Sequence, residues 1–264
     1  MILALDTSSA AASAALVDAE GVLLGESGPV EGPRQARRVL ECVHEALGAA
    51  GSDLGDVASI VCGLGPGTFT GLRIGVATAR ALAQAAGVPL SGVSSLEALA
   101  GGLASGVTGA SAKCFVPLID GRRREVFAAV YRRAPERTPQ TGGRPAVSRS
   151  GAGHAASDPG AAGSRPGAPG PSAWPRLAPV APLEVVPADA LAEFLEPRPG
   201  AVVGGDGARA YADRLPPAVV VERAVTAPTA LMVARTFLAG SDSLTTGFGA
   251  TLPVYGREPD AVPR

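Results

Sequence analysis

The chain has 264 residues, of which 46% are hydrophobic and 18% charged, so it holds enough apolar material for one large domain or two small ones. Its formal net charge is -1, and binding of nucleic acid through a broad basic face is therefore not expected. Cys42, Cys62 and Cys114 are isolated in the sequence and do not suggest a disulfide framework. The first apolar run follows Met1 without a charged leader, and the apolar stretch 71–87 contains arginines. These features favour a cytoplasmic protein.

The first part of the chain predicts strands followed by alternating helices and strands. Three short apolar runs at 2–6, 11–17 and 22–26 predict an antiparallel meander. Apolar residues with helical spacing then predict an amphipathic helix that begins near Pro33 and ends before Gly51. A buried strand, a glycine-rich turn and a second helix follow at 57–62, 63–67 and up to Gly87.

After a short helix at 96–103, the chain begins again with strands and ends with helices. Strands are predicted at 114–119, 125–131, 183–186 and 201–203, and helices at 188–195, 208–214 and 228–238. The order predicts an α/β protein with two halves of related plan. We place the N-terminal lobe at residues 1–105 and the C-terminal lobe at 106–264.

Residues 134–178 interrupt the second half. They contain eight prolines and eight glycines among 45 residues and almost no periodic apolar positions. Because such a composition buries too little apolar surface to offset the entropy of ordering, we predict a disordered loop. The only tryptophan, Trp174, falls within it, and its use as an anchor for a partner is the less favoured interpretation.

The glycine-rich turn GLGPGTFTGLRIG at 63–75 has two interpretations. Its backbone amides could cradle an anion at the start of a helix, but a tight strand-to-helix turn is favoured because no P-loop ending is present. On the helix that follows, small residues recur every four positions. Such a row allows another backbone to pack closely against the helix. That backbone is either part of the same chain or belongs to a partner. As candidate interface residues we name Val39, Val43, Leu47, Gly71, Gly75 and Ala79.

Catalytic chemistry has weak support in the sequence. There are only two histidines, and His44 stands without a second histidine at metal-ligand spacing. Asp6 and Asp120 each end a predicted strand, where a carboxylate could neighbour magnesium or phosphate, but a hydrogen-bonded strand end is favoured. We therefore predict no catalytic residue, no metal and no cofactor.

Four segments together resemble the TsaB (YeaZ) family: residues 1–17, 63–75, 119–131 and 253–257. The resemblance implies a two-lobed actin/Hsp70/sugar-kinase-like (RNase H-like) fold, with mixed sheets and flanking helices. It also implies a non-catalytic subunit that supports a TsaD-like enzyme, together with a TsaE-like ATPase in a larger complex. That complex would form N6-threonylcarbamoyladenosine next to the anticodon, so tRNA would be contacted indirectly. A homodimer of the isolated subunit is left open.

The sequence departs from the usual pattern of the actin/Hsp70/sugar-kinase superfamily, and this departure agrees with a non-catalytic role. The string Asp6-Thr7-Ser8-Ser9 has a serine where the superfamily's phosphate loop usually has glycine. Residues 204–208 resemble an adenosine-side loop, which leaves weak contact with a nucleotide open. The alternatives are an independent ATPase or kinase of the same superfamily and, less favoured, a glycoprotease-like peptidase.

Overall fold

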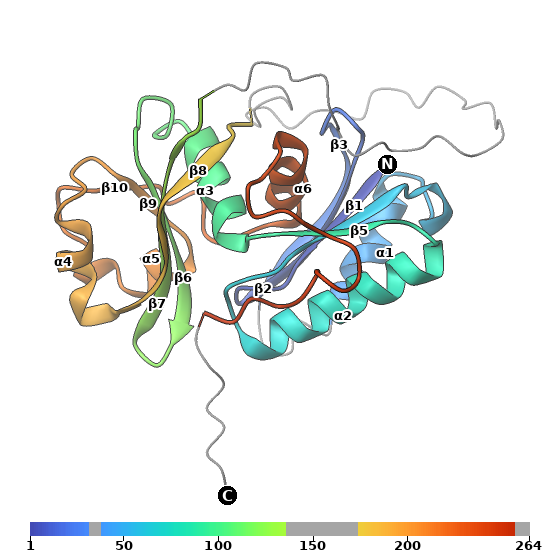
Figure 1. The fold of residues 1–264 in the computed structure, drawn as a ribbon, viewed down its shortest axis with the longest axis horizontal. Coiled ribbons are helices and arrows are strands. Elements are labelled where there is room, and N and C mark those ends of the chain that lie inside the picture. The colour runs from blue at the N-terminus through green and yellow to red at the C-terminus, as the bar shows by residue number, and fades with distance from the viewer. Residues whose placement is uncertain (32–37, 136–173, 257–264) are drawn as a thin grey trace, which may run out of the picture.

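The computed structural model describes residues 1–31, 38–135 and 174–256, which form two mixed β-sheets with helices on their faces (Figure 1). The first sheet has the strand order β11-β5-β4-β1-β2-β3. Its strands are β1 Ile2–Asp6, β2 Ala11–Val17, β3 Leu23–Glu31, β4 Ser59–Gly63, β5 Leu90–Val93 and β11 Thr245–Thr246. The second sheet has the order β10-β9-β6-β7-β8. Its strands are β6 Phe115–Arg122, β7 Glu125–Arg133, β8 Leu177–Pro187, β9 Val202–Gly204 and β10 Val220–Val221.

The two sheets repeat one plan. In each, the first strand pairs antiparallel with the second and parallel with the fourth, as β1 does with β2 and β4 and β6 does with β7 and β9. The third strand then extends the antiparallel side and the fifth the parallel side. The predicted two-lobed α/β architecture with a duplicated plan is thereby confirmed.

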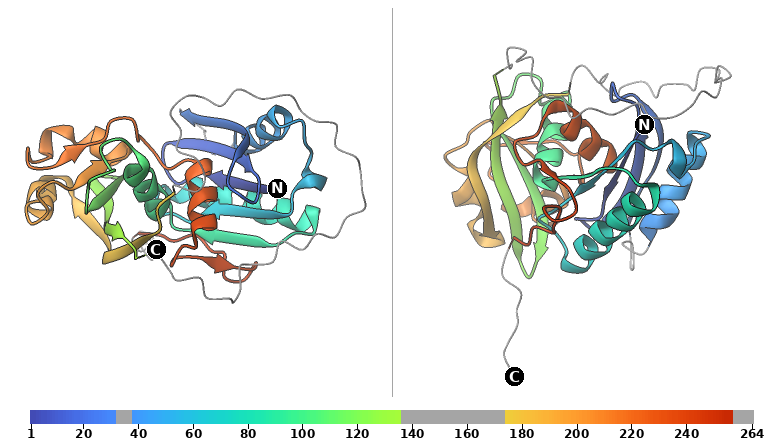
Figure 2. Two further views of the ribbon diagram at one scale, coloured as in Figure 1. Left: turned by 90° about the horizontal axis from the view of Figure 1, so that it is seen from above. Right: turned by 45° about the vertical axis from the view of Figure 1, so that its right-hand side comes forward.

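The helices cover both faces of each sheet, because alternate residues of a strand point to opposite faces. They are α1 Val39–Ala49, α2 Phe69–Ala86, α3 Ser95–Ser105, α4 Leu191–Leu195, α5 Asp206–Ala210 and α6 Ala230–Ala239. Leu3 and Leu5 of β1 pack with α1 and α2, whereas Ile2 and Ala4 pack with α6. In the second sheet, one face packs against α3 and the other against α4 and α5. Helices α3 and α6 therefore lie between the two sheets (Figure 2).

The boundary of the lobes needs one correction. We predicted that residues 106–264 form the C-terminal lobe, but the chain returns to the first lobe after residue 229. Helix α6 packs on β1 and β2, and β11 adds an antiparallel edge to β5. Because these contacts join distant parts of the sequence, local periodicity does not reveal them.

The predicted disordered loop at 134–178 is wrong at its C-terminal end, while residues 136–173 lie outside the described part of the chain. The Ala134 amide donates to the Arg176 carbonyl over 2.9 Å, and β8 already begins at Leu177, opposite Arg133. The sequence predicted residues 183–186 of this strand, and prolines disguised its beginning. The prolines are tolerated because β8 is an edge strand, which forms backbone hydrogen bonds with a neighbouring strand on one side only.

Trp174 also belongs to the folded body. Its indole lies against Gly101 of α3, where an added Cβ would stand 2.7 Å from the ring. Its Nε1 donates to the Thr236 hydroxyl of α6 over 3.2 Å. Trp174 therefore joins the two helices that lie between the sheets, and the partner-anchor interpretation has no support from its position.

Candidate functional site

Asp6, at the end of β1, is the centre of a buried polar cluster. Its Oδ1 accepts hydrogen bonds from the Ser8 amide at 2.9 Å and the Ser8 hydroxyl at 2.8 Å, and its Oδ2 accepts from the Ser95 hydroxyl at 2.8 Å. The Ser95 hydroxyl in turn accepts from the Gly65 amide at 3.1 Å. Burial raises the pKa of Asp6 to about 6, because removing water penalises the charged carboxylate more than these donors stabilise it.

The glycine-rich loop packs directly onto the turn that follows Asp6. The Thr68 amide donates to the Ser8 carbonyl over 2.8 Å, and a Cβ added at Gly67 would lie 1.9 Å from that oxygen. A Cβ at Gly63 would lie 1.9 Å from the Asp6 carboxylate. These glycines are therefore required for close contact within the chain. The close approach of this loop to the Ser8 carbonyl agrees with the tight-turn interpretation.

The buried row of small residues on α2 faces the same turn. A Cβ at Gly75 would lie 2.0 Å from the Thr7 hydroxyl oxygen, and one at Gly71 would lie 2.3 Å from the Thr7 carbonyl. The Thr7 hydroxyl itself donates to the Gly71 carbonyl over 2.8 Å. The backbone that approaches this row is thus the chain's own β1–β2 turn.

All six residues that we named as candidate interface residues are buried within the chain. Val39, Val43, Leu47 and Ala79 belong to the core between α1, α2 and the first sheet, and Gly71 and Gly75 face Thr7. Their side chains thus offer no outer surface in this structure. The exposed face of α1 includes Leu40, which is 56% exposed. The exposed face of α2 carries a second small-residue row, formed by Ala77, Ala81 and Ala85.

A second buried carboxylate, Asp206, lies at the junction of the lobes. Its Oδ1 accepts from the Asp120 amide over 2.9 Å, and it also interacts with the backbone of Ala10 in the other lobe. Burial raises the pKa of Asp206 too, and its charge adds to the rise at Asp6. Within the described residues no group of three or more histidine, cysteine or acidic side chains could hold a metal ion.

Ser95 and Asp206 were missed as members of this centre when the sequence was read. Ser95 follows Ser94, the N-cap of α3, whose hydroxyl accepts from the Glu97 amide at 3.3 Å. The Ser-x-x-Glu spacing is a helix-start signal and predicts the helix, but it says nothing of the neighbouring hydroxyl. Asp206 reaches Asp120 across 86 positions of sequence, and no local pattern records that contact.

The segment near the C-terminus that carries the PVYG motif lies across the glycine-rich loop. The Val254 amide donates to the Leu64 carbonyl over 2.7 Å. The Tyr255 ring lies 4.9 Å from that of Phe69, and Arg73 stacks over Phe69 and donates to the Tyr255 hydroxyl over 3.2 Å. Two motifs that are remote in sequence are therefore one structural unit.

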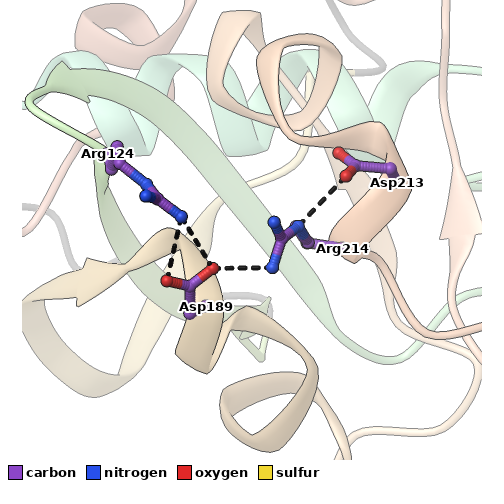
Figure 3. A network of polar contacts seen from close by, with 4 residues as sticks. All are labelled: Arg124, Asp189, Asp213 and Arg214. Carbon is purple, nitrogen blue, oxygen red and sulfur yellow. Dashed lines mark hydrogen bonds and ion pairs between the residues drawn. The ribbon is translucent and has the colours of Figure 1, made fainter.

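The arginine-rich hairpin between β6 and β7 is tied to the outer helices by exposed ion pairs (Figure 3). Arg124 and Arg214 both contact Asp189, at 3.1 and 2.6 Å, and Arg214 also contacts Asp213 at 3.0 Å. Exposed pairs of this kind contribute roughly 0–1 kcal/mol each. Carboxylates accompany these arginines, so the network joins the hairpin to its neighbours and does not form a purely basic surface.

Comparison with known proteins shows which proteins this chain resembles. A family model described as TsaD, tRNA N6-adenosine threonylcarbamoyltransferase, matches residues 32–148. The tRNA threonylcarbamoyladenosine biosynthesis protein TsaB of Escherichia coli (strain K12) is 38% identical over 140 residues, which cover 50% of this chain and 55% of that protein. The solved structure of YeaZ from Pseudomonas aeruginosa matches with a TM-score of 0.65 and 28% identity, over 96% of this chain and 98% of that one. The chain is thus similar to the TsaB (YeaZ) proteins, and to YeaZ from Pseudomonas aeruginosa over nearly its whole length.

Another relative is an uncharacterized protein of Mycobacterium tuberculosis (strain ATCC 25618 / H37Rv). It is 40% identical over 131 residues, 49% of this chain and 58% of that protein. The chain thus spans rather more than half the length of the curated relatives that it matches. The TsaB resemblance seen in the four sequence segments is confirmed. None of the helices in the described ranges has both the length and the apolar character needed to cross a membrane.

Proposed function

We propose that this chain is a TsaB-type, non-catalytic subunit in the formation of N6-threonylcarbamoyladenosine in tRNA. It would bind and support a TsaD-type catalytic subunit in the cytoplasm, with a TsaE-like ATPase in the larger complex, and contact tRNA indirectly. The observation that carries the proposal is the packing of the turn after Asp6. The Ser8 and Ser95 hydroxyls donate hydrogen bonds to the Asp6 carboxylate, and the glycine-rich loop packs onto the Ser8 backbone. This packing supports the proposal that the chain contributes a binding surface to the complex.

We further propose that α1 and α2 carry the partner interface, through their outer faces. The two helices lie side by side on one face of the first sheet (Figure 1). Leu40 on α1 and Phe69 at the start of α2 are 56% and 42% exposed. The outer alanines Ala77 and Ala81 are one helical turn apart, and such small side chains let a second helix approach closely. The buried residues Val43 and Gly75 would then support the interface from beneath. The same face would also serve a homodimer of the isolated chain.

The test is the variant Ala81→Arg, which places a long charged side chain on the outer row of α2. Its matched control is Ala192→Arg, at an exposed alanine of α4 in the other lobe. We expect both variants to melt near the unmodified chain. Ala81→Arg should weaken capture of the TsaD-type protein from the same genome at least about 10-fold, because a buried unpaired charge is costly. Modified adenosine in tRNA, measured by mass spectrometry in cells that depend on the variant, should fall with it.

Two results would contradict the proposal. Normal capture and normal tRNA modification with Ala81→Arg would remove this face from the interface. ATP turnover or peptide cleavage by the purified chain alone, lost in Asp6→Asn, would favour the independent ATPase or kinase, or the peptidase, over a supporting subunit.

A further inference from the structure

One end of the second sheet carries three cations from three separate segments. Lys113 and Cys114 come directly before β6, and Arg132 lies on the neighbouring strand β7. Arg198 lies between α4 and β9, and β9 also pairs with β6. Burial raises the pKa of the Cys114 thiol, and the charges of Arg132 and Arg198 both oppose that rise, so both guanidinium groups lie near the thiol. We call Lys113, Arg132 and Arg198 the basic patch.

None of these three cations is neutralised by a carboxylate in the described part of the chain. Lys113 and Arg132 are exposed, and neither forms an ion pair there. Arg198 is half-buried, donates a hydrogen bond to the Phe194 carbonyl and lies 4.4 Å from the centre of the Phe194 ring. The Arg198 side chain is therefore held in place while it keeps its charge.

The opposite end of the same strands is arranged differently. There Arg124 and Arg214 share the carboxylate of Asp189 (Figure 3). At the basic patch, the exposed carboxylates in and just after α4, at Glu193 and Glu196, form no ion pair with any described residue. Since like charges repel one another, the mutual interaction of the patch residues does not stabilise the fold, and their charges are available to a ligand.

The chemistry of the basic patch suits phosphate groups better than a protein surface. Interfaces between proteins normally have an apolar centre inside a polar rim. In the described residues, no exposed large apolar side chain belongs to 112–114, 131–133 or 197–200, the segments that carry the patch. Contacts to a nucleic-acid backbone are made instead by arginine and lysine, and a guanidinium can donate two parallel hydrogen bonds to one phosphate.

We propose that the basic patch binds the phosphate backbone of RNA directly. The choice of RNA rests on the proposed function, which brings the chain close to tRNA but assigns it only an indirect contact. The patch belongs to the second lobe, whereas the proposed partner interface lies on α1 and α2 of the first, so one chain can engage both. Three cations make a small contact, which agrees with a chain whose net charge is -1.

The experiment measures the fluorescence anisotropy of a labelled, unmodified tRNA transcript titrated with the full chain, at several concentrations of NaCl from about 50 mM upwards. The variant is Lys113→Gln with Arg132→Gln, because neither side chain loses an ion pair to a described residue. The matched control is Arg124→Gln with Arg214→Gln, which removes the same charge at the opposite end of the lobe. Thermal melting of each protein establishes that it is folded.

We expect the tRNA to bind the unmodified chain and the control with an affinity that falls as the salt concentration rises. The Lys113/Arg132 variant should bind at least about 10-fold more weakly at about 50 mM NaCl. The slope of log Kd against log salt should decrease by about 1.4 to 1.8, since each lost phosphate contact removes roughly 0.7–0.9. Absence of salt-dependent binding by the unmodified chain, or equal losses in the variant and the control, would overturn the proposal. Binding of poly-L-glutamate in place of the tRNA would also overturn it, in favour of an acidic protein.

Cys114 provides a local reporter of the contact, because it is partly exposed whereas Cys42 and Cys62 are buried. Bound tRNA should slow the alkylation of Cys114 by N-ethylmaleimide at least about 5-fold when most of the chain is in the complex. Unchanged alkylation under conditions in which the tRNA is bound would place the RNA elsewhere on the chain and overturn the proposal.

This proposal and the proposed function fail separately. The Lys113/Arg132 variant should capture the TsaD-type protein normally, and Ala81→Arg should bind the tRNA as the unmodified chain does. Normal capture by a chain that does not bind the tRNA would remove the RNA contact alone. Binding of the tRNA through the patch, with no loss of capture in Ala81→Arg, would support the RNA contact and remove the proposed interface alone.

Discussion

Replacing Asp6 by asparagine tests whether the buried centre is structural. Asparagine has the shape of aspartate but carries no charge, so it reproduces the protonated form of the side chain. Its carbonyl oxygen can keep both hydrogen bonds from Ser8, and its amide nitrogen can donate to the Ser95 hydroxyl. Ser95 would then change from donor to acceptor, as it must when Asp6 itself is protonated.

The magnitude follows from the pKa of Asp6, which burial raises from 3.8 to about 6. A shift of about two units corresponds to roughly 3 kcal/mol, because one unit is about 1.4 kcal/mol. Since the folded pKa is the higher one, the folded chain binds the proton more tightly than the unfolded chain. The associated stabilisation is fully present below pH 3.8 and is lost as the pH rises through about 6. At pH 8 the unmodified chain therefore holds a buried charge that Asp6→Asn lacks.

The assay is urea unfolding of both proteins at pH 8, 7, 6 and 5. We expect Asp6→Asn to have the larger free energy of unfolding at pH 8, by up to about 3 kcal/mol, and the difference to shrink towards pH 5. Asp213→Asn, at an exposed residue, changes the net charge equally and should differ from the unmodified chain by less than about 0.5 kcal/mol. A difference that stays constant from pH 8 to pH 5, or an Asp6→Asn protein that is less stable at pH 8, would refute this account of the site.

Two further substitutions test the packing. Gly75→Ala should lower the free energy of unfolding by about 1–3 kcal/mol, because the added Cβ meets the Thr7 hydroxyl. Its control is Gly48→Ala on α1, where the added Cβ meets no atom within 4 Å and should raise the free energy of unfolding by about 0.5–1 kcal/mol. Equal effects of the two substitutions in urea unfolding would contradict the assigned faces. Trp174→Ala should lower the free energy of unfolding by roughly 3 kcal/mol, because the variant loses the indole packed on Gly101 and its hydrogen bond to Thr236. An unchanged melting temperature would contradict the packing of Trp174 against α3 and α6.

The sequence predicted most of the elements because their signals are local. The alternation of β1 and β2, the helical stripe from Val39 to Leu47 and the stop at Gly87 all record burial or backbone geometry at single positions. What it did not predict depends on partners remote in sequence. The row at Gly71 and Gly75 indicates that a backbone approaches α2, but spacing alone does not say whose backbone it is. The first part of strand β8, before the predicted residues 183–186, was missed because its prolines are acceptable at an edge, and the sequence does not reveal which strand is an edge.

The repeated plan of the two sheets explains why the polar centre lies where it does. Asp6 ends β1, and Asp120 lies near the end of β6, at corresponding places in the two halves. In the first half, donors from Ser8 and Ser95 surround the carboxylate. In the second, the Asp120 amide is held by Asp206, which also interacts with the backbone of Ala10 in the first half. The interaction of Asp206 with the Ala10 backbone thus links the two halves at this junction. This polar centre is buried, whereas the proposed partner interface lies on exposed residues of α1 and α2.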